Sequence, residues 1–209
     1  MEQKTQTRVK LKNVRLSYVN LLTPNSFEGQ NDPKFRCDVL IRKDDETNVT
    51  LVREAIASAI ENAKAGKGCF AGEDLKKAKA VGKWHSALKD GDVEKPDDPA
   101  YKGCYFISPW KKADDAPQVV DIKGTLITKD TPNASDMVYS GVYAHITVSF
   151  FAYKNLGNYG TGCYLGNVLT LEKGERLAGG KKAEDDFGDD FEDAKNDSSA
   201  LLEEDDGLL

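Results

Sequence analysis

The sequence predicts a mainly β protein, built as a small β-barrel with a helical elaboration. Most segments with strand character are short, rich in β-branched and aromatic residues, and separated by glycine and proline. One region, after the second of these segments, changes to a helical period. An order of two strands, a helical insertion and about four further strands fits a barrel better than an α/β layer fold.

Residues 7–19 form the first predicted strand. Apolar residues alternate with polar ones along it, but the parity of the alternation changes at Asn13, as it does at a β-bulge. Bent strands of this kind are common where a sheet closes on itself, which supports the barrel. Residues 20–33 carry two prolines, one glycine and three asparagines, and they are predicted to form a loop.

Residues 34–42, KFRCDVLIR, form the clearest half-buried strand of the chain. The apolar residues from Phe35 to Ile41 occupy alternate positions and face one side of the strand. The charged residues between them, Asp38 included, are predicted to face the other side.

The helical insertion is predicted over about residues 45–102. Residues 48–65 place apolar side chains at i, i+3 and i+4, as an amphipathic helix does, and Gly66 is a suitable end for it. Residues 73–81 predict a second, shorter helix. The polar stretch 82–103 contains two prolines and an Asp-Gly pair, so it predicts a long connection, a feature that is usually functional or disordered.

Strands return after this insertion, at residues 104–108, 118–127, 142–153 and 163–171. Residues 157–166 are glycine-rich but precede a strand, whereas a phosphate-binding loop follows a strand and opens a helix. They therefore predict a hairpin turn with Tyr159 exposed at its tip. Residues 1–177 are predicted to form one domain, and residues 178–209, highly charged and poor in apolar residues, a disordered tail.

Charge is distributed unevenly along the chain. The net charge of −6 would by itself argue against a nucleic-acid ligand. Residues 181–209, however, contain three lysines and twelve acidic residues, a net charge of −9, so residues 1–180 carry 26 basic and 23 acidic residues, a net charge of +3. A mildly basic body with a strongly acidic tail indicates a surface for polyanions and a tail that competes for it or recruits partners.

Catalytic and metal-binding patterns are weak in this sequence. The four cysteines are scattered without a CxxC pair, and only His85 and His145 supplement them, so neither a metal site nor a disulfide is predicted. His145 lies within a strand pattern and is predicted to be structural. We expect no enzyme activity and no cofactor. The polar N-terminus and the lack of a long apolar stretch favour a cytoplasmic protein without a membrane partner.

Basic and aromatic residues recur together outside the core pattern, and this is the strongest functional signal. Cations follow the phosphates of single-stranded DNA, and rings stack on its bases, each stack contributing about 1–3 kcal/mol. Trp84 and Trp110 lie in polar segments with basic neighbours and are expected to be exposed, whereas Tyr105 and Tyr153, within strands, are as consistent with packing. The candidate DNA-binding residues are Lys10, Lys12, Tyr18, Lys34, Arg36, Lys83, Trp84, His85, Lys89, Tyr105, Trp110, Lys111, Lys112, Tyr153, Lys154 and Tyr159.

A series of segments resembles the single-stranded DNA-binding proteins of tailed phages and prophages. In order, these are LSYVNLL, DPKFRCDVLIRKDD, HSALKDGDVEKPDDPAYKGCYFIS, PQVVD, YSGVYAHITVSFFAYKN, GTGCYLGNVLTLEKGERLAGG and DDFGD, which together cover nearly the whole chain. The resemblance implies an OB-type five- to six-stranded β-barrel with a helical insertion and an acidic C-terminal tail. It also implies binding of single-stranded DNA without sequence preference, in phage replication or recombination in the host cytoplasm, and no catalytic residues.

The acidic tail is interpreted as a competitor of DNA that also recruits replication or recombination proteins. Two other functions remain open: a non-enzymatic β-barrel interaction or virion protein whose aromatic residues belong to the core, and a metal-dependent nuclease. The sequence also leaves open whether the chain forms a homo-oligomer. The candidate partner-binding residues of the tail are Phe187, Phe191, Leu208 and Leu209.

Overall fold

The computed structural model describes residues 6–26, 31–171 and 173–177. By its internal contacts the chain divides into two units, residues 1–176 and residues 177–209, and the sheet and helices belong to the first. The predicted tail lies outside the described residues, together with its four partner-binding candidates. Its disorder and the domain boundary predicted after residue 177 therefore stay predictions.

The described residues contain ten strands, all in one sheet, and three α-helices. The strands are β1 (Arg8–Asn25), β2 (Lys34–Arg42), β3 (Trp84–His85), β4 (Lys89–Asp90), β5 (Cys104–Ile107), β6 (Trp110–Lys112), β7 (Val119–Val120), β8 (Leu126–Ile127), β9 (Tyr143–Asn155) and β10 (Asn158–Thr170). The helices are α1 (Glu46–Lys64), α2 (Leu75–Ala80) and α3 (Gly91–Glu94), and two 3-10 turns are η1 (Pro99–Tyr101) and η2 (Ala134–Asp136).

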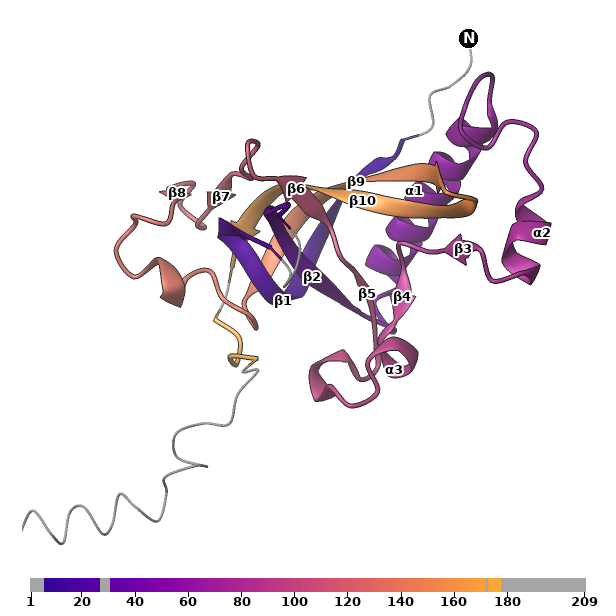
Figure 1. Cartoon of the computed structure of the whole chain (residues 1–209). Coiled ribbons are helices and arrows are strands. Elements are labelled where there is room, and N and C mark those ends of the chain that lie inside the picture. The colour runs from indigo at the N-terminus through magenta and orange to yellow at the C-terminus, as the bar shows by residue number, and fades with distance from the viewer. Residues whose placement is uncertain (1–5, 27–30, 172, 178–209) are drawn as a thin grey trace, which may run out of the picture. The chain divides into compact units, whose positions relative to one another are not determined.

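The sheet closes into a barrel because β6 pairs on both of its sides. β1 pairs antiparallel with β2 and β9, and β9 pairs antiparallel with β10. β6 completes the ring, since it runs antiparallel to β2 and parallel to β10, where Trp110 lies beside Tyr164. The cycle β1–β2–β6–β10–β9 is a five-stranded barrel of OB type, so the predicted mainly β fold with a helical insertion is confirmed (Figure 1).

The bulge predicted at Asn13 is confirmed. The register between β1 and β9 shifts between Leu11 and Val14, and Asn13 has a left-handed backbone with φ of 52°. The Asn13 backbone N–H donates a hydrogen bond to Nδ1 of His145 at 3.0 Å. His145 therefore satisfies an N–H that the bulge takes out of the ladder, which confirms its predicted structural role.

The predicted helix over residues 48–65 is confirmed as α1, which begins slightly earlier. The side chain of Asp45 caps its first turn by accepting a hydrogen bond from the backbone N–H of Asn48. Val49, Val52 and other apolar residues at helical spacing are buried and pack on β9 and β1. Figure 1 shows α1 and α2 beside the tip of the β9–β10 hairpin, with β7 and β8 toward the opposite end of the barrel.

The prediction of an irregular connection over residues 82–103 is wrong. This stretch contains β3, β4, α3 and η1; β3 pairs in parallel with β10, and β4 pairs antiparallel with β5. The stretch is anchored by Tyr101, whose side chain is fully buried. Strands of two residues have no periodicity for sequence reasoning to detect, and the buried contacts that hold them come from distant parts of the chain.

Two other predicted boundaries are also wrong. β1 continues to Asn25, so the first part of the loop predicted at residues 20–33 is strand. The segment 118–127 holds two separate strands, β7 and β8, because a turn from Asp121 to Gly124 interrupts it; the Asp121 carboxylate accepts hydrogen bonds from backbone N–H groups of that turn.

The hairpin turn predicted over residues 157–166 is much shorter, and Tyr159 is half-buried rather than exposed at the tip. The turn consists of Leu156 and Gly157, both with positive φ. Gly160 and Gly162 lie within β10, opposite Tyr153 and Phe151 of β9. A Cβ at these two positions would be only 2.7 and 2.6 Å from ring atoms of Tyr153 and Phe151, so a larger residue would collide with the rings. The glycines thus allow both rings to lie flat across β10.

The barrel is filled by aliphatic side chains, among which Leu11, Leu16, Val39, Ile107 and Val148 are fully buried. All four cysteines are free thiols, and three of them are buried. In the part of the chain that the structure describes, no cluster of three or more potential metal ligands occurs. No helix within the same residues is long and apolar enough to cross a membrane.

Candidate nucleic-acid interface

A groove crosses the barrel on the face of β2, β5 and β6. Its first part has a volume of about 710 Å³. Its second part has a volume of about 490 Å³ and shares Lys89, Ser108 and Trp110 with the first. Together the two parts form the binding groove. OB barrels bind oligonucleotides on the face of their second and third strands, which β2 and β5–β6 occupy in this chain.

Cations and rings both line the binding groove. Tyr18 and Asn20 come from β1, Lys34 and Arg36 from β2, and Phe106 from β5. The groove is also lined by Lys89, Lys95, Trp110, His85, Phe151 and Tyr153. This combination can neutralise phosphates and stack on bases along one continuous path.

Trp110 lies where the two parts of the groove meet. It is half-buried and belongs to β6, so the expectation of an exposed residue in a polar loop is wrong. The ammonium group of Lys34 lies 4.5 Å from its ring centroid, and the Tyr164 ring meets it edge-on at 5.1 Å. Tyr164, 45% exposed, in turn stacks on Phe151 at 4.2 Å. Three rings therefore form a contiguous series with a cation at one end.

Tyr18 lies at an irregularity of β1, where its backbone is left-handed and the pairing with β2 shifts register. Its φ of 47° is uncommon for a bulky residue, and the register between β1 and β2 shifts between Ser17 and Asn20. The side chain is 57% exposed at the edge of the groove, and the ammonium group of Lys95 lies 4.1 Å from its ring centroid. Strained backbone at an exposed ring beside a cation is consistent with a ligand-binding role.

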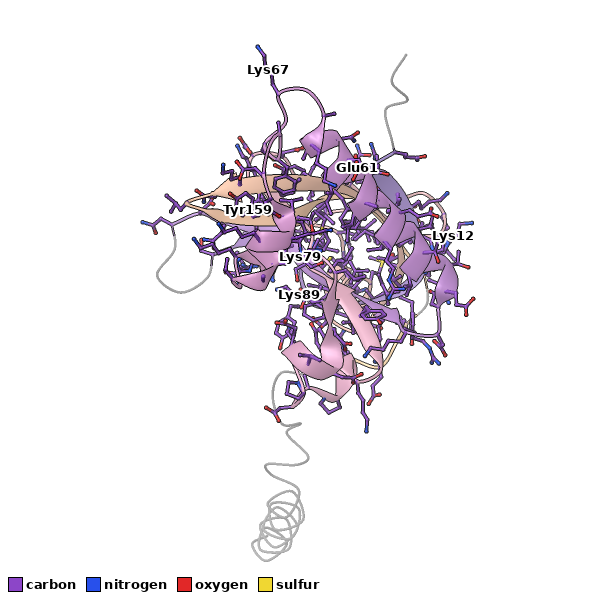
Figure 2. All side chains as sticks on the ribbon, turned by 90° about the vertical axis from the view of Figure 1, so that its right-hand side faces the viewer. Lys12, Glu61, Lys67, Lys79, Lys89 and Tyr159 are labelled. Atoms are coloured by element: carbon purple, nitrogen blue, oxygen red, sulfur yellow. The ribbon has the colours of Figure 1, made fainter. Side chains whose placement is uncertain are left out.

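Lys154 and Tyr159 line neither part of the binding groove, and both bind Glu73, which precedes α2. One carboxylate oxygen accepts a hydrogen bond from Lys154 Nζ and the other from the Tyr159 hydroxyl, each at 2.5 Å. These bonds lower the pKa of Glu73 and raise those of Lys154 and Tyr159. Figure 2 shows Tyr159 on the β9–β10 hairpin, with Lys79 of the helical insertion close to it in the view.

Substituting Glu73 with glutamine should release Lys154 and Tyr159 and tighten binding of single-stranded DNA about two- to threefold, the range expected of a surface ion pair. Because the pKa of Glu73 is lowered, the contact is fully formed at neutral pH and is lost only as the pH falls through that lowered value. Binding isotherms of both proteins with an oligo-dT would measure the change.

Glu61→Gln is the matched control for this variant. Glu61 pairs with Lys64 on α1 and carries the same charge within the helical insertion, whereas the ion pair and the hydrogen bond to Lys154 and Tyr159 are made by Glu73. If both variants tighten binding equally, net charge rather than the release of Lys154 and Tyr159 explains the effect.

The other sequence candidates lie in different places. Trp84 is half-buried, packs on Phe70 at 6.0 Å and lines a separate cavity of about 320 Å³ between α1 and α2. Tyr105 contacts Lys43 and Arg53 instead of the groove. Lys111 pairs with Asp115, and Lys83 and Lys112 line neither part of the groove. Lys10 and Lys12 also lie elsewhere on β1, and Figure 2 shows Lys12 far across the molecule from Tyr159.

Seven of the sixteen candidates therefore line the binding groove. These are Tyr18, Lys34, Arg36, His85, Lys89, Trp110 and Tyr153. Sequence reasoning missed Lys95, Phe106 and Phe151. The pairing of Phe151 with a glycine across the hairpin is a signal that would have marked this ring as lying on the strand surface.

Comparison with known proteins gives a consistent set of relatives. Residues 7–199 match the family model described as Enterobacter phage Enc34, ssDNA-binding protein. Protein p50 of Acyrthosiphon pisum secondary endosymbiont phage 1 is 28% identical over 184 residues, which cover 88% of this chain and 94% of the relative.

Two solved structures share the fold of this chain. The single-stranded DNA-binding protein of bacteriophage Enc34 in complex with ssDNA is 23% identical and superposes with a TM-score of 0.64, covering 85% of this chain and 96% of that one. The single-stranded DNA-binding protein gp2.5 of bacteriophage T7 is 16% identical, with a TM-score of 0.52 and 97% of each chain covered. At these identities the likeness concerns the fold alone.

Proposed function

Because the chain belongs to the family of the Enterobacter phage Enc34 single-stranded DNA-binding protein, we propose that it binds single-stranded DNA in the binding groove. The observation that carries the proposal is the juxtaposition of cations and rings on the face of β2, β5 and β6. Lys34, Arg36, Lys89 and Lys95 would neutralise phosphates, and Tyr18, Trp110 and Tyr153 would stack on bases. Neither interaction reads base edges, so the binding is independent of sequence.

The biological role that we propose is protection of exposed strands during phage DNA replication or recombination, in the cytoplasm of the host cell. The protein acts by binding and has no catalytic step. Its acidic tail competes with DNA for the groove and recruits replication or recombination proteins, which the charge difference between residues 1–180 and 181–209 supports.

The proposed function is tested by titrating an unstructured oligo-dT and a duplex of the same length over a range of salt concentrations. Binding of the oligo-dT should be the tighter, with a slope of log affinity against log salt of about −0.7 per phosphate contacted, or about −3 if the four groove cations each meet one phosphate. Equal affinity for both DNAs, or an affinity that does not depend on salt, would refute the proposal.

The same mixtures decide between the alternative functions. An interaction or virion protein would leave the oligo-dT unbound, and a metal-dependent nuclease would shorten labelled DNA when magnesium or manganese is added. We expect the oligo-dT to be bound, and the labelled DNA to stay intact when magnesium or manganese is added.

A further inference from the structure

Asp38 lies on the groove side of β2, but its side chain is not a solvated charge. The sequence predicts that it faces outward with the other charged residues of the strand, whereas only 8% of Asp38 is exposed. The segment 89–103, which contains β4, α3 and η1, covers this part of β2. A buried carboxylate is costly unless hydrogen bonds satisfy it, so its partners identify its role.

Three donors satisfy the Asp38 carboxylate. The Tyr101 hydroxyl lies at 2.5 Å, Ser108 Oγ at 2.6 Å and Lys95 Nζ at 3.0 Å. Tyr101 is fully buried, and its burial together with the hydrogen bond to Asp38 raises the pKa of Tyr101, so its hydroxyl remains a donor near neutral pH. Removing the charge of Asp38 would thus affect every member of this cluster.

Lys95 connects this cluster to Tyr18, a predicted stacking ring of the groove. Its Nζ lies 3.0 Å from the Tyr101 hydroxyl oxygen, and 4.1 Å from the ring centroids of both Tyr18 and Tyr101. An ammonium group has three donors, so two are used by Asp38 and Tyr101 and one remains for a phosphate. Because Lys95 lies between the two rings, the other face of the exposed Tyr18 ring is left for a base.

We propose that Asp38 is a positioning residue for single-stranded DNA: with Tyr101 it fixes the Lys95 ammonium against Tyr18, so that one phosphate and one base are bound side by side. The proposal rests on the proposed function. A lysine side chain has many rotamers, and holding it in one of them before DNA arrives removes that ordering cost from binding.

The direction in which one substitution changes the affinity for oligo-dT distinguishes a positioning role of Asp38 from a purely electrostatic effect. Asp38→Asn removes a negative charge from a groove for a polyanion, so electrostatics alone predicts tighter binding. Positioning predicts the opposite, because an amide holds the Lys95 ammonium less strongly than a carboxylate. We expect Asp38→Asn to bind oligo-dT about three- to tenfold more weakly, with a salt slope less steep by about 0.7.

Glu94→Gln is the matched control. Glu94 is exposed and lines the same groove, but no interaction of its side chain is found among the described residues. Its substitution removes the same charge without altering Lys95, and we expect slightly tighter binding. The double variant Asp38→Asn with Lys95→Met should bind no more weakly than Lys95→Met alone, because the effect of Asp38 passes through Lys95.

The affinity of the wild-type protein for oligo-dT is measured first. If the wild type does not bind, the proposed function is refuted, and the result does not concern the role of Asp38. If the wild type binds and Asp38→Asn binds equally or more tightly, or if the two substitutions weaken binding additively, Asp38 does not position Lys95. Where Asp38→Asn does not fold, Tyr101→Phe decides: it keeps the ring and removes the hydroxyl, and an affinity equal to wild type overturns the proposal.

Discussion

Replacing Trp110 with alanine is expected to weaken binding of oligo-dT by about 1–3 kcal/mol, or roughly 5- to 150-fold. Trp110 lines both parts of the binding groove, so a nucleotide path that crosses β6 passes over this ring. The substitution also leaves Lys34 without the ring beneath its ammonium group and Tyr164 without its edge-on partner. Equilibrium titration of the variant with a fluorescently labelled oligo-dT measures the loss.

Trp110→Phe and Trp84→Ala are the controls for this prediction. Phenylalanine keeps a stacking face, so most of the affinity should remain. Trp84 is the other tryptophan and is also half-buried, but it lies in the cavity between α1 and α2, so its removal should change the affinity by less than about twofold. If Trp84→Ala is the damaging variant and Trp110→Ala binds normally, the DNA path lies over the helical insertion instead.

The elements that could be predicted from the sequence are those with a long, regular apolar period. β2 and α1 are of this kind, and so is β1 with the change of parity at Asn13. The short strands β3, β4 and β6 could not be predicted, because two or three residues carry no period and their pairing depends on β10, β5 and β2. The closure of the barrel by β6 is therefore the main feature of the fold that needed the structure.

The candidate site was predictable where a residue's surroundings are local. Lys34 and Arg36 lie on the polar face of a regular strand, and the alternation of β2 indicates their direction. The surroundings of Tyr159 and Lys154 could not be predicted in this way, because both residues bind Glu73, which is distant in sequence. Lys95 was missed for the same reason, since its position is set by Asp38 and Tyr101 and not by its neighbours in the sequence.

Removing residues 181–209 is expected to tighten binding of oligo-dT about tenfold at low salt, and the gain should shrink as salt rises. The segment carries a net charge of −9 and is tethered to a body of net charge +3, so its effective concentration near the groove is high and it competes with the DNA backbone. The truncated chain should keep the wild-type melting temperature, because residues 1–176 form a unit by their own contacts. It should also lose binding to replication partners.

A variant with Phe187 and Phe191 changed to alanine separates the two ways in which the tail would compete. Its charge equals that of the wild type, so if the competition is electrostatic its affinity for oligo-dT should stay at the wild-type value. If the two rings occupy base-stacking positions, the affinity should rise toward that of the truncated chain. A truncated chain that binds DNA more weakly than the full chain would show that the tail contributes to binding, and the competition model would then be wrong.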